Sequence, residues 1–353
     1  MAEFHTGHEP DRKASARLRP TIVDVAHLAG VSVRTASRVV NKSTLVNSET
    51  RTRVEEAILT LDFSPSSRAR GLRSGRSNLI GVIQGDANAH VIGAFQHGIL
   101  ASCTAQGFEL VVHSASIDDP DMVHNIRDFI RRSRVDGVIV LSPTSEDPAL
   151  PAALSALGVP AVAIAARRVE GYPAMLVSNE RAAAADMADH LHTLGHRRIG
   201  LVTGPVARLS SQERAGGFLA ALAARGTHLE SHHCIQADYS FEGGLDAGLA
   251  LLSGDNRPTA IFACNDISAL GVLKAAATLG LHVPDQVAVA GFDGSDIGMM
   301  VSPALTTIRR PLDRMARMAT ASLIAMIDDA SVVETSESFA LELVQRGSTM
   351  GGN

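Results

Sequence analysis

Two arginines, Arg34 and Arg38, lie one helical turn apart in the segment VSVRTASRVVN, residues 31–41. At about 100° per residue, Ala36 and Val39 share one side of a helix here, and the two arginines share the opposite side. A guanidinium group donates hydrogen bonds to phosphate oxygens, and it can bond O6 and N7 of a guanine together. The segment therefore predicts a helix with one apolar face for packing and one cationic face for an anionic partner.

Three short helices are expected to position this face. Thr21 with Asp24 three residues later is typical of a helix start, and Gly30 ends that helix. Ser32 then caps the arginine-bearing helix, and a third helix is expected after Ser48. Two helices joined by a tight glycine turn predict a helix-turn-helix, whose second helix fits the major groove of DNA. An αα-hairpin with a solvated arginine face is the alternative at this point.

The charge of the chain is uneven. Between residues 11 and 76 there are 13 Lys and Arg but only 6 Asp and Glu, although the whole chain has a net charge of -5. A basic segment in an otherwise acidic protein favours a polyanionic partner, while a solvated basic tail is the simpler explanation.

Length and composition limit the classes of protein that are possible. The chain has 353 residues, 45% hydrophobic and 20% charged, which is too long for one core and typical of a globular protein of two or three domains. It contains no apolar run long enough for a membrane span, and its first 20 residues lack the apolar stretch of a signal peptide. Three widely spaced cysteines predict neither a disulfide scaffold nor a metal site, and they fit a reducing cytoplasm.

From Leu79 onward, short apolar runs alternate with helical stretches, which predicts an α/β architecture with buried parallel strands. The runs are LIGVIQ, ELVVHS, DGVIVLS, PAVAIA, RIGLVTG, TAIFACN and VAVAGFD. LIGVIQG and RIGLVTG look like one opening strand used twice, so two similar lobes with a cleft between them are expected.

Polar residues follow several of these strands, where doubly wound sheets bind their ligands. They are Asp86, Ser142, Asn265, Asp266 and Asp293. Asp293 ends a very apolar strand, so its carboxylate is expected at the edge of the sheet, where it could accept hydrogen bonds from ligand hydroxyls. Asn265 and Asp266 have a structural alternative, since either could cap the helix that follows.

An enzyme is the rival class for such a cleft, but the expected catalytic motifs are missing. The sequence has no Gly-x-Ser-x-Gly elbow, no phosphate loop, no His-Glu-x-x-His and no Gly-x-Gly-x-x-Gly after a strand. Its 14 histidines show no metal-ligand spacing with carboxylates. We therefore expect no catalysis, no metal and no cofactor. A secreted binding protein is the third option, and it would have a signal peptide and no helix-turn-helix.

The segment from Thr21 to Ile83 closely resembles the N-terminus of the lactose-repressor (LacI/GalR) family. LGHRRIGLVTGP, RAGGF, FACNDISALGVLKAA, VPDQVAVAGFD and PALTTIRRP extend the resemblance over most of the chain. It implies a ligand-responsive transcriptional repressor in which one set of side chains reads bases and another anchors phosphates. The base-reading positions are Val33, Arg34 and Arg38, and the phosphate-anchoring positions are Thr21, Ser32, Thr35 and Asn41, with Ser37 and Ser43 left open as phosphate contacts.

Residues 61–78 contain too few apolar side chains for a core and predict a basic linker, in which Pro65 could start a short helix. The resemblance implies a hinge helix that forms on operator DNA, with Leu72 as the wedge in the central minor groove and Arg70 beside it. The family usually has Asn after the proline, whereas this chain has Ser66.

The remaining chain resembles the periplasmic-binding-protein fold with which the family senses small molecules. Arg214 matches the family's effector-clamping arginine, Asp293 matches the aspartate that accepts ligand hydroxyls, and Tyr239 falls where an aromatic often faces a sugar ring. On family grounds the effector is expected to be a carbohydrate in a site formed by Asp86, Ser142, Arg214, Tyr239, Asn265 and Asp293.

The sensor also departs from the family pattern. DANAHVI has Val91 and Ile92 where relatives have two aromatic residues, and PAVAIAARR ends in Ala165 and Ala166 where many relatives have an aspartate. A purine, a phosphorylated sugar or a repressor without effector therefore stay open.

Together these features predict a small all-α helix-turn-helix domain followed by an α/β two-lobed, doubly wound effector domain with parallel sheets. The expected divisions are a disordered leader at 1–20, the DNA-binding domain at 21–62, the hinge or linker at 63–78 and the effector domain at 79–353, with its N-lobe at 79–177 plus 309–335 and its C-lobe at 178–308 plus 336–346. The expected protein is a cytoplasmic repressor that binds a near-palindromic operator in double-stranded DNA. A homodimer is favoured over a tetramer, because the tetrameric member after which the family is named has a leucine-heptad tail after its last strand, whereas FALELVQRGSTMGGN has no heptad pattern.

Overall fold

The computed structural model describes residues 20–40, 43–63, 76–85, 88–329 and 335–350. By its internal contacts the chain divides into two compact units, residues 1–77 and 78–353. Each unit has its own hydrophobic core, and each is described separately below.

The first unit contains the three expected helices, α1 (Ile22–Leu28), α2 (Val33–Val40) and α3 (Ser48–Thr60). The carboxylate of Asp24 accepts hydrogen bonds from the backbone N and the hydroxyl of Thr21, both at 2.7 Å. Gly30 has a φ of +63°, a conformation that glycine adopts without steric cost, and the chain turns there into α2. The side chain of Ser32 accepts from the backbone N of Thr35 at 3.1 Å, and Asn47 caps α3 in the same way through Thr50 at 2.8 Å.

One small core holds these three helices together. Its buried members are Val25, Ala26, Ala29, Ala36, Val39, Val54 and Ala57. All seven lie on the apolar faces that the 3.6-residue period predicts, so the helix-turn-helix prediction is confirmed at the level of fold.

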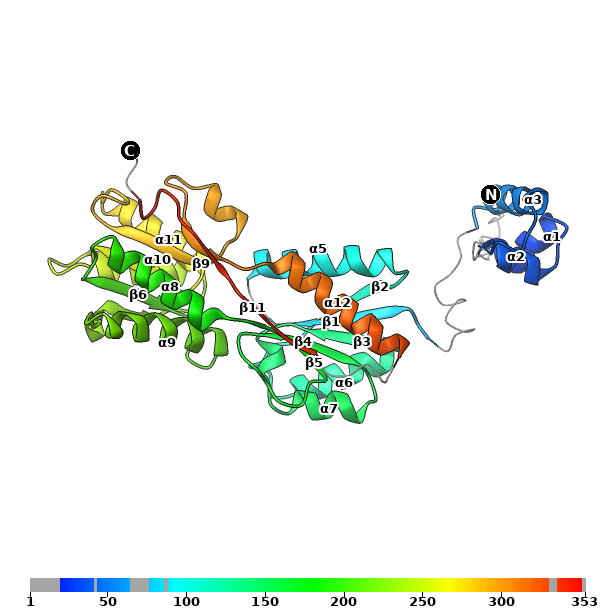
Figure 1. The fold of residues 1–353 in the computed structure, drawn as a ribbon, viewed down its shortest axis with the longest axis horizontal. Helices are drawn as coiled ribbons and strands as arrows, with labels where there is room; N and C mark the ends of the chain where they lie inside the picture. The colour runs from blue at the N-terminus through cyan, green and yellow to red at the C-terminus, as the bar shows by residue number, and fades with distance from the viewer. Residues whose placement is uncertain (1–19, 41–42, 64–75, 86–87, 330–334, 351–353) are drawn as a thin grey trace, which may run out of the picture. The chain divides into compact units, whose positions relative to one another are not determined.

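The second unit contains two six-stranded sheets, one in each lobe (Figure 1). In the first lobe the strand order is β11-β5-β4-β3-β1-β2, and all neighbouring strands are parallel. The strands are β1 (Leu79–Gln84), β2 (Glu109–Ser114), β3 (Gly137–Val140), β4 (Ala161–Ala165), β5 (Ala174–Ser178) and β11 (Thr335–Phe339).

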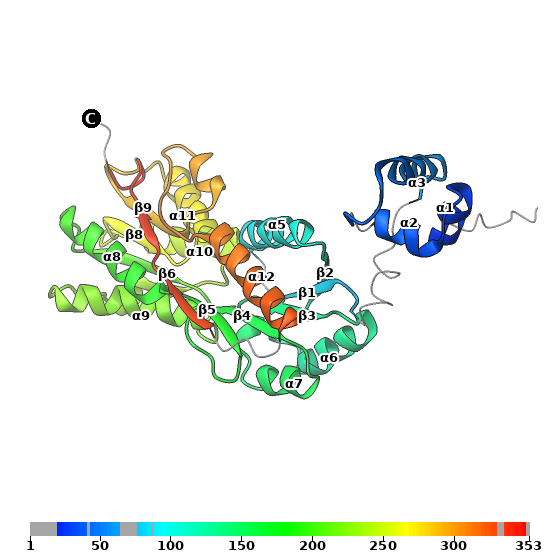
Figure 2. The ribbon, with the colours of Figure 1, turned by 45° about the vertical axis from the view of Figure 1, so that its right-hand side comes forward.

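Helices cover both faces of the first sheet, so every central strand is apolar on both sides. α5 (Ala89–Ala105) and α12 (Leu312–Asp328) lie side by side on one face (Figures 1 and 2). α6 (Met122–Ser133) and α7 (Leu150–Ala156) pack on the other face.

The second lobe repeats this plan. Its strand order is β12-β10-β9-β8-β6-β7, and only β12 runs antiparallel to its neighbour. The strands are β6 (Ile199–Thr203), β7 (Cys234–Gln236), β8 (Ala260–Ala263), β9 (Ala288–Asp293), β10 (Thr306–Arg309) and β12 (Glu342–Val344). α8 (Glu180–Thr193) and α9 (Leu209–Ala224) cover one face, and α10 (Phe241–Leu252) and α11 (Asp266–Thr278) cover the other.

The repeated opening strand is confirmed, because LIGVIQ forms β1 and IGLVT forms β6. β1 lies between β2 and β3, and β6 lies between β7 and β8, so both strands hold the same place in their sheets. The expected fold class, a helix-turn-helix unit and a doubly wound α/β unit of two lobes, is therefore correct.

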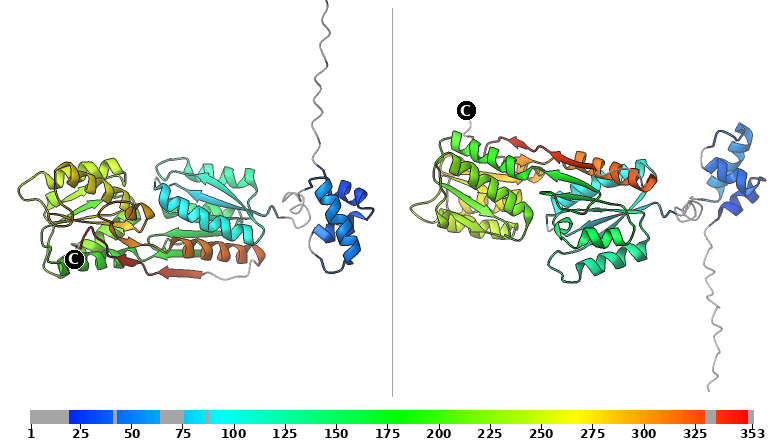
Figure 3. Two further views of the ribbon diagram at one scale, coloured as in Figure 1. Left: turned by 90° about the horizontal axis from the view of Figure 1, so that it is seen from above. Right: turned by 60° about the horizontal axis from the view of Figure 1, so that its bottom comes forward.

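The chain crosses between the lobes three times, after β5, after β10 and after β11. Figure 3 shows the last crossing, where the C-terminal segment in red passes from the first lobe to the second. The sequence placed this return at residue 336, but Thr335–Phe339 pairs with β5 in the first sheet. The C-lobe segment therefore begins after Phe339, because the Thr and Ser of β11 concealed a strand whose Phe339 is buried in the first core.

Candidate functional site

The cationic face predicted for α2 is present on the first unit. Arg34 is exposed, Arg38 is half-buried, and Val33 between Ser32 and Arg34 keeps 43% of its surface accessible. The hydroxyls of Ser32 and Thr35 lie 2.9 Å apart at the start of the helix. The N-terminal end of α2 thus presents hydroxyl donors beside guanidinium groups, which is the chemistry that phosphates and base edges bind.

Four of the predicted site residues lie outside the described residues. They are Asn41 and the hinge residues Arg70 and Leu72 in the first unit, and Asp86 in the second. Thr21 is described and lies exposed at the start of α1.

The second unit contains a buried ion network between its lobes, centred on Arg214 of α9. Its Nε lies 2.7 Å from Oε2 of Glu180, its Nη2 lies 3.3 Å from Oδ1 of Asp293, and its Nη1 donates to the carbonyl of Cys264 at 2.6 Å. Burial opposes the charged guanidinium, but the carboxylates of Glu180 and Asp293 outweigh this and hold the pKa of Arg214 well above its ordinary value. Arg214 is therefore a permanent cation with two carboxylate partners.

Glu180 begins α8, directly after β5, and only 2% of its side chain is exposed. Ser178 donates to its Oε1 at 2.9 Å, and Arg214 contacts both of its oxygens. Burial raises the pKa of Glu180, but the charges of Arg214 and Arg310 lower it by more, so the pKa of Glu180 is below its ordinary value. Glu180 is therefore ionised beside Arg214.

Asp293 ends β9, as the sequence predicts, and its carboxylate is buried at the carboxyl edge of the sheet. Its φ is 121°, in a region that residues other than glycine rarely occupy, which is typical of a functional position. Burial raises the pKa of Asp293 to about 7, against the opposing effect of Arg214 and Arg310. This carboxyl group can therefore exchange a proton near neutral pH.

Three polar contacts join the two lobes around this network. Asn88 of the first lobe donates from Nδ2 to Oδ2 of Asp293 at 2.9 Å. Glu146 accepts from the backbone N of Leu209, the first residue of α9, at 3.0 Å. Nη2 of Arg208 lies 2.8 Å from Oδ2 of Asp118.

Glu146 is a half-buried acid of the first lobe at this junction. Ser142 donates from its hydroxyl to Oε1 of Glu146 at 2.6 Å, so the predicted site residue Ser142 positions an acid that the sequence analysis missed. Burial raises the pKa of Glu146 above its ordinary value, against the hydrogen bonds from Ser142 and Leu209.

Arg310 lies at the second crossing between the lobes, between β10 and α12. Its Nη1 is 3.6 Å from Oδ1 of Asp293, its Nε is 3.8 Å from Oε1 of Glu180, and 8% of its side chain is exposed. Its guanidinium carbon lies 5.9 Å from the centre of the Phe95 ring. A second buried cation thus faces the same two carboxylates as Arg214.

A small cavity of about 30 Å³ lies inside this junction. Its walls combine apolar side chains with the polar groups of the network: Val91, Ile92, Phe95, Leu141, Ser142, Ile164, Glu180, Ser210, Arg214 and Arg310. This volume has room for about two water molecules, so a sugar-sized ligand requires the lobes or the side chains to move apart.

The structure places Arg214 beside Asp293, and Ser142 lines the same cavity as Arg214. Asn265 and Tyr239, in contrast, make contacts that are typical of a structural role. Asn265 caps α11 by accepting from the backbone N of Ser268 at 2.9 Å, and it donates to the carbonyl of Tyr239 at 2.9 Å. The ring of Tyr239 packs against Gly204, and its centre lies 5.9 Å from the guanidinium carbon of Arg214. Neither residue lines the small cavity, and Asp293 borders it only through its contacts with the lining residues Arg214 and Arg310.

Asp266 does not cap α11, since Asn265 does, and its carboxylate instead has a bracing role. It accepts from the backbone N and the hydroxyl of Ser295, both at 2.7 Å, and from the hydroxyl of Thr307 at 2.5 Å. These bonds tie α11 to the segments after β9 and within β10, so Asp266 supports the strand that presents Asp293.

Four residues of the site were missed by the sequence analysis: Asn88, Glu146, Glu180 and Arg310. Glu180 and Arg310 follow the ends of β5 and β10, two strands that were not among the predicted ones. The rule that ligands bind beyond the carboxyl ends of parallel strands would have found both residues if those strands had been recognised.

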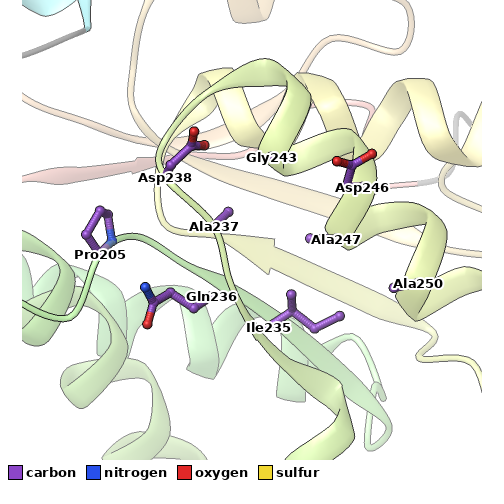
Figure 4. A pocket seen from close by; sticks show the side chains of 9 residues that line it. All are labelled: Pro205, Ile235, Gln236, Ala237, Asp238, Gly243, Asp246, Ala247 and Ala250. Carbon is purple, nitrogen blue, oxygen red and sulfur yellow. The ribbon is translucent and has the colours of Figure 1, made fainter.

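A larger hollow of about 450 Å³ lies on the second lobe beside β7 and α10 (Figure 4). Its charged residues are Asp238 and Asp246, both exposed. Asp238 accepts from the backbone N and the hydroxyl of Ser240, which organises the turn before α10. The hollow shares no lining residue with the small cavity, and within the described ranges no cluster of His, Cys, Asp and Glu could hold a metal ion.

Comparisons with known proteins agree with both units. Residues 21–66 match the family described as bacterial regulatory proteins, lacI family, and residues 188–349 match the periplasmic binding protein-like domain. The ribose operon repressor of Escherichia coli (strain K12) is 31% identical over 328 residues, which cover 93% of this chain and 99% of the relative.

Two solved structures resemble both units in one alignment. The lac repressor dimer bound to operator and the anti-inducer ONPF superposes with a TM-score of 0.81 at 27% identity, covering 95% of this chain and all of that one. The complex of the transcriptional regulator CelR with cellobiose has a TM-score of 0.69 at 27% identity, covering 94% of this chain and all of that one. Among the described helices, none is long and apolar enough to cross a membrane.

Proposed function

Because the chain belongs to the lacI family of bacterial regulatory proteins, we propose that it is a repressor that binds a near-palindromic operator as a homodimer and responds to a small molecule between its lobes. The observation that carries the proposal is the union of two features in one chain. An arginine-bearing helix-turn-helix is followed by a two-lobed unit whose lobes meet at a buried Arg214–Asp293 pair. A repressor of this kind works in the cytoplasm, where bacterial DNA lies.

The DNA-binding role is assigned to residues 21–62, with 63–78 as the hinge and 79–353 as the effector domain. Val33, Arg34 and Arg38 are proposed to read bases, because they lie on the accessible side of α2. Thr21, Ser32, Thr35 and Asn41 are proposed phosphate anchors, and Arg70 and Leu72 are proposed minor-groove contacts. The two-fold symmetry of a dimer would be matched by two half-sites in the operator.

The effector role is assigned to the junction of the lobes. Asp293 and Arg214 can accept from and donate to the same ligand, and Ser142 lines the cavity beside them. Asp86, Tyr239 and Asn265 stay proposed members of this site on the family resemblance. The similar regulator CelR was solved in complex with cellobiose, which supports a carbohydrate or a carbohydrate derivative as the effector of this chain.

No catalytic role is proposed for the cleft. Relatives of this chain are named as repressors, and repressors are not enzymes. The buried charges of the cleft pair with one another and with backbone carbonyls, which suits ligand binding and conformational change.

Selection from a random duplex library with the purified full chain would test the function. The retained DNA should share a near-palindrome with two half-sites, and molar mass from light scattering should be that of a dimer. A chain that retains duplexes without any common sequence, or that enriches none, would contradict the proposal. The Arg34→Ala variant provides the matched control, since it should lose the enriched sequence while keeping its fold.

A further inference from the structure

The guanidinium of Arg310 is buried without a hydrogen bond to any described residue. Only 8% of its side chain is exposed, and its Nε is a buried donor without an acceptor. Its distances of 3.6 Å to Asp293 and 3.8 Å to Glu180 are longer than hydrogen bonds. A guanidinium carries five N–H donors, and a charged donor left without an acceptor inside a protein is costly.

The neighbouring acids cannot be regarded as free partners for this cation. Both oxygens of Glu180 are engaged by Arg214, and one of them also accepts from Ser178. Asp293 accepts from Asn88 and faces Arg214 at 3.3 Å. Arg214 therefore makes the guanidinium hydrogen bonds to Glu180, and Arg310 acts on both acids through its charge while its hydrogen-bonding capacity is unused.

Arg310 lines the small cavity between the lobes, the place proposed above for the effector. The wall that the first lobe contributes consists of Ser142 and the apolar residues Val91, Ile92, Phe95, Leu141 and Ile164. Hydroxyls of a neutral sugar that faced this wall would be buried without partners, which costs free energy. The cavity thus combines a guanidinium that can donate strong hydrogen bonds to an anion with few polar groups that could bind the hydroxyls of a neutral sugar.

We propose that Arg310 is an anion-binding residue of the effector site and that the effector carries a negatively charged oxygen group, a carboxylate or a phosphate. The planar fork of an arginine matches either group with two parallel hydrogen bonds. This inference rests on the proposed function, because it names the chemical class of the effector for the same cleft. If the effector is a carbohydrate, this inference restricts it to an acidic or phosphorylated derivative. A small organic acid is the other class of effector that fits.

The test uses matched neutral and anionic probes with the purified full chain. The sets are D-ribose, D-ribonate and ribose 5-phosphate; D-glucose, D-gluconate and glucose 6-phosphate; and lactamide with lactate. Binding is measured by the shift of the thermal midpoint and by calorimetry. We expect at least one anionic probe to bind about tenfold or more tightly than its neutral partner, and whether it is an acid or a phosphate ester identifies the group.

Two variants separate charge recognition from a structural role. Arg310→Gln should remove the preference for the anionic probe, and Arg310→Lys should restore part of it because the charge returns. The matched control is Arg309→Gln, since Arg309 is an exposed neighbour that pairs with Glu342 on the surface. It should bind the anionic probe like the parent, and thermal unfolding of each variant without ligand reports whether its fold is intact.

Three results would overturn the inference: neutral probes that bind at least as tightly as their anionic partners, an anionic probe that Arg310→Gln binds as tightly as the parent, or no anionic probe that binds. The function proposed above fails in a different experiment. A chain that binds a palindromic duplex and releases it with a neutral sugar would keep its function and lose the anion assignment.

Discussion

At the scale of single residues, the site consists of buried charged side chains, each of which needs an oppositely charged partner to offset the cost of removing it from water. Arg214, Glu180, Asp293 and Arg310 are each at least nine-tenths buried, at the junction of two lobes. Taking such charges out of water is expensive, and removing one member leaves the others uncompensated. The network is therefore better explained by ligand binding than by stability of the fold.

Replacing Arg214 with Ala should destabilise the protein strongly. Glu180 would lose both of its hydrogen bonds from a guanidinium and keep only the longer contact with Arg310, and the expected loss in the free energy of unfolding is about 3 to 5 kcal/mol. Chemical denaturation measures this loss. Arg181→Ala is the matched control, because Arg181 is half-exposed where it pairs with Glu213 and should cost less than about 1 kcal/mol. Equal losses for the two variants would show that Arg214 is not compensating buried charge.

The proton on Asp293 should make stability depend on pH. Its pKa is raised by burial from 3.8 to about 7, so the folded state binds a proton that the unfolded state releases between these values. The contribution of the proton on Asp293 to stability is therefore fully present below about pH 4 and is lost as the pH rises through about 7. The free energy of unfolding of the parent minus that of Asp293→Asn should fall across this range and then level off. A difference that rises with pH would contradict the raised pKa.

At the scale of elements, the sequence predicted those whose apolar pattern is strong. The three helices of the first unit follow from caps and from the 3.6-residue period, and seven apolar runs became strands of the two sheets. β7 and β12 were missed because they are edge strands of three residues. β10 and β11 were missed because their Thr and Ser residues conceal the pattern: the hydroxyls of Thr306 and Thr307 are buried but hydrogen-bonded.

Failure to recognise some strands also limited how much of the site could be predicted from the sequence. Asp293 and Arg214 were found because one ends a recognisable strand and the other matches a motif. Glu180 and Arg310 follow unrecognised strands, so only the fold brings them into the cleft. Asn88 meets Asp293 across 205 residues of sequence, a contact that no local pattern contains.

The accessible face of α2 carries a prediction at this scale. Arg34→Ala and Arg38→Ala should each weaken operator binding by about 1 to 3 kcal/mol, because a bidentate contact with guanine is lost, while weak non-specific binding stays nearly unchanged. Titrations of the selected operator and of a scrambled duplex at one salt concentration give the ratio. If both affinities fell in parallel, these arginines would be phosphate anchors instead of base readers.

At the scale of the whole molecule, regulation requires that effector binding in the cleft and operator binding by the DNA-binding unit shift the same equilibrium between two arrangements of the lobes. The lobes are joined by Asn88–Asp293, Glu146–Leu209 and Asp118–Arg208, so a ligand that enters must rearrange some of these contacts. A ligand shifts such an equilibrium only by its different affinities for the two arrangements. The coupling is reciprocal, because operator DNA must change effector affinity by the same factor as effector changes operator affinity.

The most direct test of this account is an operator titration by fluorescence anisotropy, with and without the effector found in the probe screen, for the parent and for Asp293→Asn. Asp238→Asn is the control, because this carboxylate lies in the outer hollow and outside the ion network. The account predicts that effector changes operator affinity of the parent and of Asp238→Asn by about fivefold or more. Asp293→Asn should bind bare operator like the parent but need about tenfold more effector for the same change, since a charge-assisted hydrogen bond is lost. An unchanged effector response in Asp293→Asn, or an equal loss of bare operator affinity, would contradict the claim that the cleft between the lobes controls DNA binding.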